Sequence, residues 1–177
     1  MIQAKRATAL LWSLGAMLIV VSLGATIQAQ TIRIETRRKT GHAFITTKGT
    51  FSAMHVGGMK YDYVYPAMDV ALQTSSKSDK GFKTSDLAPA YFVDRRGVRH
   101  RLVAIGTFGL ETVVSLRFFP GESGMPIFAN DGTACCVVLG NAFTNGSWRG
   151  RVSRITPILD AIARPPTEQA HPGVQAD

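Results

Sequence analysis

Between residues 31 and 155 the sequence is a succession of short apolar segments separated by turn-forming residues, and this pattern strongly limits the possible folds. Residues 31–38 alternate between apolar and charged side chains, as a half-buried strand does. Asn130, Asp131 and Gly132 form a strong hairpin signal between two apolar runs. The same criteria predict strands at residues 42–47, 50–55, 60–65, 69–74, 90–93, 98–105, 112–119, 125–129, 133–139 and 148–155. So many short strands favour an all-β fold with a closed or nearly closed barrel.

The end of the chain departs from this pattern. Thr156 can cap a short helix that has Pro157 in its first turn and runs to about Ala163. Residues 164–177 are polar and contain proline, so we expect a flexible tail after the helix.

Residues 1–29 are expected to form a targeting segment. Lys5 and Arg6 precede residues 7–27, which are almost wholly apolar, and cleavage after Ala29 would remove the segment as a signal peptide. The run is also just long enough to span a bilayer, so an uncleaved signal-anchor that attaches the protein to the membrane is the alternative. In either case we expect the remainder to be exported, to the periplasm or the medium.

The chain is basic, with a formal charge of +8, and such a surface attracts polyanions without identifying a partner. Its densest cluster, residues 95–101, lies on a predicted hairpin and has few aromatic neighbours on which bases could stack. We therefore expect a solvated face and no specific nucleic-acid partner. A basic β-barrel that binds anionic polymers stays open as an alternative function.

The two cysteines, Cys135 and Cys136, are adjacent within an apolar run. Adjacent cysteines fit disulfide geometry badly, so two buried thiols are expected. No spacing typical of metal ligands occurs, and we predict neither a metal nor another cofactor.

Ser123 lies in a loop, residues 120–126, with glycine before and after it. Glycine allows a sharp turn, which can expose the serine hydroxyl and direct the N–H groups of Gly121 and Ser123 to one point. That combination provides a nucleophile beside an oxyanion hole. A Gly-x-Ser-Gly segment alone is a weak signal that favours an ordinary surface loop, so the interpretation depends on a histidine and an acid elsewhere.

His55 ends the apolar segment Ser-Ala-Met-His, and Asp69 begins the segment Asp-Val-Ala-Leu. Together with Gly-Glu-Ser-Gly-Met-Pro at residues 121–126, in the order His, Asp, Ser, they resemble the motifs of the chymotrypsin/trypsin-like serine peptidase family. The resemblance extends over roughly residues 40–160 and is to small peptidase domains of the bacterial or viral type.

The resemblance implies one peptidase domain, residues 30–163, made of two packed antiparallel β-barrels and a short C-terminal helix. The first barrel, about residues 30–76, would be trimmed, and the second would span about residues 88–155. It further implies a catalytic triad of His55, Asp69 and Ser123, and an oxyanion hole formed by Gly121 and Ser123. The implied activity is that of a serine endopeptidase, which hydrolyses protein or peptide substrates through an acyl-enzyme. The oligomeric state is left open.

The resemblance also places Arg117 at the base of the substrate pocket, with Leu139, Gly140 and Gly150 along its walls. An arginine there would favour an acidic substrate side chain by charge pairing. An outward-facing strand residue is the alternative for Arg117, so substrate preference stays open.

The chain departs from the family pattern at Glu122 and Met125, where the family has Asp and Gly. His55 and Asp69 are also only fourteen positions apart, which makes Asp69 the least secure member of the triad. Asp62 is the one other acid nearby. An inactive, peptidase-like binding module is therefore a further alternative.

Overall fold

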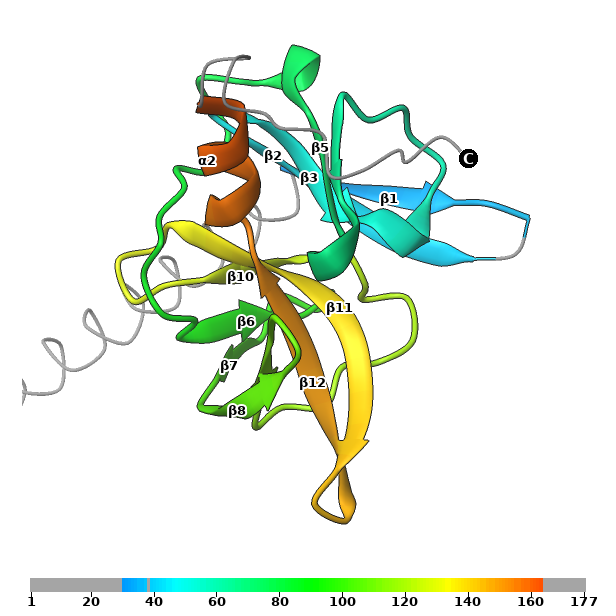
Figure 1. Ribbon diagram of the computed structural model, residues 1–177, viewed down its shortest axis with the longest axis vertical. Helices are drawn as coiled ribbons and strands as arrows, with labels where there is room; N and C mark the ends of the chain where they lie inside the picture. Colours follow the sequence, from blue (N-terminus) through cyan, green and yellow to red (C-terminus); the bar gives the residue numbers. More distant parts are fainter. Residues whose placement is uncertain (1–29, 38, 164–177) are drawn as a thin grey trace, which may run out of the picture.

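The computed structural model describes residues 30–37 and 39–163, which form two antiparallel sheets and a short C-terminal helix (Figure 1). The prediction of an all-β fold of two antiparallel β-barrels with a short C-terminal helix is confirmed. The predicted targeting segment and the predicted tail lie outside the described residues. No helix in the described part of the chain is long and apolar enough to cross a membrane.

The first sheet has the strand order β1-β2-β3-β5-β4. Its strands are β1 Thr31–Glu35, β2 Thr40–Thr46, β3 Gly49–Ala53, β4 Tyr63–Tyr65 and β5 Val70–Gln73. Three single-turn 3-10 helices follow strands of this sheet: η1 Met54–Val56, η2 Pro66–Met68 and η3 Thr74–Ser76. Phe44 on β2 stacks on Phe51 on β3 with ring centroids 5.8 Å apart, and both are fully buried. Of the strand predicted at residues 60–65, only the last half forms a strand, which is β4.

The second sheet has the order β7-β6-β10-β11-β12-β9-β8. Its strands are β6 Tyr91–Val93, β7 Arg99–Arg101, β8 Ala104–Phe108, β9 Glu111–Val114, β10 Pro126–Phe128, β11 Ala134–Thr144 and β12 Ser147–Arg154. The predicted strand 98–105 is two strands, and the one predicted at 112–119 ends at Val114. β11 continues past residue 139 because it pairs with β12 up to the turn at Asn145 and Gly146, both of which have positive φ.

One apolar core cluster contains residues of both sheets, and a second cluster belongs to the second sheet alone. Phe82, in the segment that joins them, packs edge-on against Phe128 of β10, and their ring centroids lie 5.1 Å apart. The final helix, α2 Thr156–Ala163, returns to contact β4 and β5 of the first sheet, with Ile158 buried in the shared core (Figure 1). The loop that carries Ser123 precedes β10 and therefore lies where the second sheet meets the first.

Candidate active site

His55 and Asp69 come together because β3 and β5 are neighbours in the first sheet. Ala53 pairs with Val70, so the residues after β3 and before β5 meet at the same end. His55 lies on η1 and Asp69 ends η2. Between His55 and Asp69 the chain forms β4 and then returns, so two residues that are close in sequence meet at the same end of the sheet.

Asp69 contacts His55 through both carboxylate oxygens. The His55 backbone N–H donates to Asp69 Oδ1 at 2.9 Å, and His55 Nδ1 is hydrogen-bonded to Asp69 Oδ2. Asp69 has a φ of 53°, a left-handed conformation that Asp and Asn adopt more readily than most residues. Its carbonyl accepts the Met54 N–H at 2.9 Å. The other nearby acid, Asp62, instead accepts hydrogen bonds from Thr74, so it is engaged away from His55.

The Ser123 loop is anchored to both sheets. The Ser123 carbonyl accepts the N–H of His42 on β2 at 2.7 Å, and the Gly124 N–H donates to Val138 of β11 at 2.7 Å. Gly121 has a φ of 86°, which lets the loop turn sharply before the serine. Within residues 30–37 and 39–163, neither the Gly121 nor the Ser123 N–H has a hydrogen-bond acceptor. Two donors therefore remain for an anion beside the serine.

Gly124 makes the closest approach between the loop and the first sheet. A Cβ at this position would lie 1.7 Å from the carbonyl oxygen of His42, and the residue has a φ of 86°. Only glycine satisfies both conditions. The glycine after the serine is thus required by the contact between the two sheets.

His42 is a site residue that the sequence analysis missed. It is buried, and its Nδ1 donates to the carbonyl of Gly121 at 2.8 Å. Burial lowers the pKa of His42 below its ordinary value of 6.5, since the charged imidazole would lose hydration. A neutral His42 that carries its proton on Nδ1 therefore holds the Ser123 loop at Gly121. Its one sequence signal is that it shares a strand face with Phe44.

Glu122 is also buried, although the sequence analysis had treated it only as a departure from the family motif. Its Oε2 accepts the Phe119 N–H at 2.7 Å, which closes a tight turn within the loop. Burial raises the pKa of this carboxyl, while the Phe119 hydrogen bond and the positive charge of Arg95 oppose the rise. Met125 is buried in the core of the second sheet.

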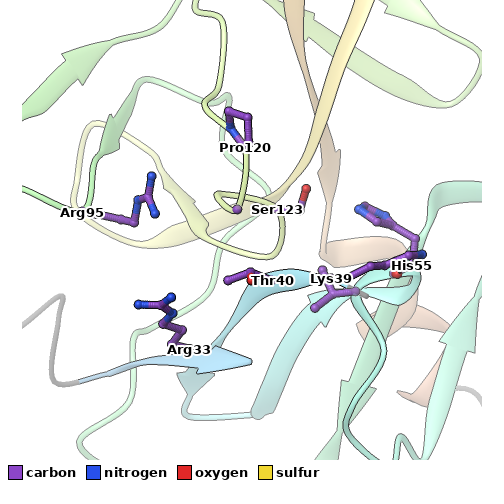
Figure 2. A pocket seen from close by; sticks show the side chains of 9 residues that line it. Arg33, Lys39, Thr40, His55, Arg95, Pro120 and Ser123 are labelled. Carbon is purple, nitrogen blue, oxygen red and sulfur yellow. Dashed lines mark hydrogen bonds between the residues drawn. The ribbon is translucent and has the colours of Figure 1, made fainter. Parts of the chain in front are cut away.

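His55 and Ser123 line one cavity of about 520 Å³ together with Gly121. Figure 2 shows the Ser123 hydroxyl directed to the side on which the His55 ring lies. In this structure the Ser123 hydroxyl donates to the Leu139 carbonyl at 3.1 Å. Catalytic hydrogen bonds are often long or misaligned without substrate and tighten when it binds. The cavity is thus lined by a serine, a carboxylate-paired imidazole and Gly121.

The four residues predicted for the substrate pocket fall in two groups. The carbonyl of Leu139 and the backbone of Gly140 lie beside Ser123, and a Cβ on Gly140 would be 4.0 Å from Ser123 Oγ. A Cβ on Gly150 would lie 2.5 Å from the Leu116 carbonyl oxygen, so Gly150 is needed for close packing. Arg117 is exposed and does not line the cavity that contains Ser123. Its role in substrate recognition stays a prediction.

The cysteines and the potential metal ligands of the described part of the chain lie as follows. Cys135 and Cys136 are free and buried, and a hydrogen bond with Cys135 together with burial raises the pKa of the Cys136 thiol. No group of metal-ligating side chains occurs among residues 30–37 and 39–163.

Solved structures that share this fold include serine proteases. The serine protease of a human pathogenic astrovirus matches with a TM-score of 0.51 and 19% identity, over 73% of this chain and 91% of the viral one. The fold is that of the chymotrypsin-like serine proteases. The inactive form of the Rv3671c protease of M. tuberculosis matches with a TM-score of 0.56 and 16% identity, over 80% and 91% of the two chains. Its active form gives 0.53 and 15%, over 78% and 82%. No protein-family model and no curated protein sequence matches the chain.

Proposed function

We propose that this chymotrypsin-like chain is a serine endopeptidase that uses His55, Asp69 and Ser123 as its catalytic triad. The observation that carries the proposal is the double contact between Asp69 and His55 at the edge of the cavity that Ser123 lines. Neighbours that share the fold and are serine proteases support the same reaction class.

In the proposed reaction, Ser123 Oγ attacks the carbonyl carbon of the scissile peptide bond while His55 takes its proton. Because Asp69 accepts the proton on Nδ1, Nε2 is the nitrogen that acts as the base. The Asp69 carboxylate holds the ring in place and stabilises the imidazolium that forms.

The tetrahedral intermediate carries a negative oxygen, and the N–H groups of Gly121 and Ser123 are the proposed donors to it. Such a donor contributes about 2.7–4 kcal/mol of transition-state stabilisation. His55 then gives its proton to the leaving amine as the C–N bond breaks. The other half of the substrate remains bound to Ser123 as an acyl-enzyme. Water, activated by the same histidine, hydrolyses the ester and restores the serine.

We also propose that the enzyme acts outside the cytoplasm. The support is the cationic start and the apolar run of residues 7–27, which suit a signal peptide or a signal-anchor. Whether the mature enzyme is released or membrane-attached depends on cleavage after Ala29. Comparison of the N-terminal sequence of the exported protein with that of the full chain distinguishes the two.

The peptidase proposal is tested by digesting a complex protein mixture with the full chain and identifying new peptide termini by mass spectrometry. Ser123→Ala should abolish these termini and leave the circular dichroism spectrum unchanged. Ser75→Ala, at an exposed serine away from the cavity, is the matched control and should retain activity. Equal cleavage by the Ser123→Ala variant would refute the proposal.

A further inference from the structure

The cavity beside Ser123 is strongly cationic. Arg33, Lys39 and Arg95 line it, and no aspartate or glutamate does so within the described residues. The three side chains come from separate segments: Arg33 from β1, Lys39 from the residue before β2, and Arg95 from the turn after β6. Figure 2 shows Arg33 and Arg95 on one side of Thr40, with Lys39 and His55 on the other. Tertiary structure therefore collects three positive charges beside the candidate nucleophile.

Lys39 and Arg95 lie against groups of the candidate site, whereas Arg33 is held in an ion pair at the surface. Lys39 Nζ donates to the His55 carbonyl at 2.9 Å, which keeps its charge next to the proposed base. A Cβ on Gly121 would lie 3.8 Å from Arg95 Nη1, so the guanidinium is adjacent to the proposed oxyanion hole. Arg33 pairs with Glu35, and both side chains are more than half exposed.

Neighbouring acids neutralise this charge only in part. The ion pair of Arg33 with Glu35 is at the surface, where such pairs are weak and exchange readily with other partners. Glu122 is buried and interacts with Arg95, but neither it nor Asp94 lines the cavity. Both acids line a separate pocket that Arg95 also borders. The open side of the cavity therefore presents net positive charge to whatever enters it.

The position of the cavity indicates which part of a substrate would meet these charges. His55 must deliver its proton to the leaving amine, so the leaving half of the peptide begins next to His55. All three cations lie in the cavity that His55 lines, whereas Leu139 and Gly140, on the β11 side of Ser123, do not line it.

We propose that the cavity formed by Arg33, Lys39 and Arg95 binds acidic side chains on the C-terminal side of the scissile bond. The assignment to that side rests on the peptidase function proposed above. Carboxylates suit two guanidinium groups and an ammonium, because charged hydrogen bonds are stronger than neutral ones.

The first test measures binding without turnover. Fluorescein-labelled hexapeptides that contain Glu and Asp, or Gln and Asn at the same positions, are titrated into the Ser123→Ala protein. The acidic peptide should bind on the order of tenfold more tightly, and this preference should shrink as salt is raised. Arg33→Gln and Arg95→Gln should each reduce the preference several-fold. Arg101→Gln, at an exposed arginine outside the cavity, should not. Equal binding of the two peptides, or an equal loss in Arg101→Gln, would overturn the proposal.

The second test locates the acidic residues relative to the cleaved bond. The active protein digests a peptide library, and acidic residues should be enriched after the cleavage site and depleted among uncleaved sequences. In the Arg33→Gln variant this enrichment should fall, because the KM for peptides with acidic residues after the cleavage site should rise. Enrichment before the cleavage site contradicts the assignment. Tight acidic-peptide binding by a protein whose Ser123 reacts with no active-site probe would instead contradict the peptidase function and retain the acidic site.

Discussion

Asp69 holds His55 at two points, because one carboxylate oxygen accepts the backbone N–H and the other is bonded to ring Nδ1. The backbone contact fixes where η1 begins, and the ring contact fixes the tautomer. Asp69 can do both because it sits in a left-handed conformation directly before β5. One residue thus sets both the position and the tautomer of the proposed base.

Asp69→Asn should lower the rate of peptide hydrolysis by a factor on the order of 10⁴. Asparagine tolerates the left-handed backbone and can still accept the His55 N–H, so the fold should be retained while the correct tautomer is lost. Steady-state kinetics on a fluorogenic peptide measures the effect. Asp62→Asn, which affects the contacts with Thr74 and Ser75, is the control and should stay within a few-fold of the parent. A near-normal rate in Asp69→Asn would assign the orienting role to another group.

Gly124→Ala should destabilise the fold by about 2–4 kcal/mol, from backbone strain at positive φ and from overpacking. The new Cβ would collide with the His42 carbonyl, which forces the Ser123 loop away from β2. Urea unfolding followed by fluorescence measures the loss. Gly109→Ala is the control, since it shares a positive φ but its Cβ would meet nothing within 4 Å. If both variants lose the same stability, the strain alone is responsible and the close contact is unimportant.

His42 should make the fold less stable in mild acid. Its pKa is lowered in the folded state, so the unfolded chain binds the proton more readily. The stabilising contribution is complete above the ordinary pKa of 6.5 and is lost as pH falls through the lower folded pKa. His42→Asn, which keeps a donor for Gly121, should flatten this part of the stability curve between pH 7.5 and 5. An unchanged slope would show that other groups cause the acid sensitivity.

The contribution of Glu122 to the stability of the fold should depend on pH in the opposite direction to that of His42. Burial raises its folded-state pKa, so its contribution is complete below the ordinary value of 4.5 and is lost as pH rises through the folded pKa. Glu122→Gln keeps an acceptor for the Phe119 N–H and removes the buried charge. Relative to the parent, this variant should therefore become more stable between pH 4 and pH 7. A stability difference that is the same at both pH values would contradict the assignment.

The strand pattern and the three proposed catalytic residues were accessible from sequence, because they depend on local alternation and short motifs. The length of β11 was not, since the apolar pattern stops at Gly140 and the strand continues only through its pairing with β12. The spacing of His55 and Asp69 looked too short for a catalytic pair because the sequence does not show which strands are neighbours. Its explanation is the pairing of β3 with β5, a contact between separate segments.

His42 and the cationic cavity depend on contacts across the two sheets. His42 reads as an ordinary strand residue until its Gly121 partner, 79 positions later, is known. Arg33 was expected on the outer face of a strand and Arg95 on a solvated hairpin. Their proximity to Ser123 follows from the packing of the first sheet against the Ser123 loop, which no local pattern records.

Reaction of the full chain with a fluorophosphonate probe tests the central claim most directly, because such probes modify serines activated by a base. Intact mass spectrometry should show one adduct, and peptide mapping should place it on Ser123. Labelling should be lost in Ser123→Ala and in His55→Ala. Absence of an adduct on the folded parent protein, or an adduct of equal yield in His55→Ala, would contradict the account of a base-activated serine nucleophile.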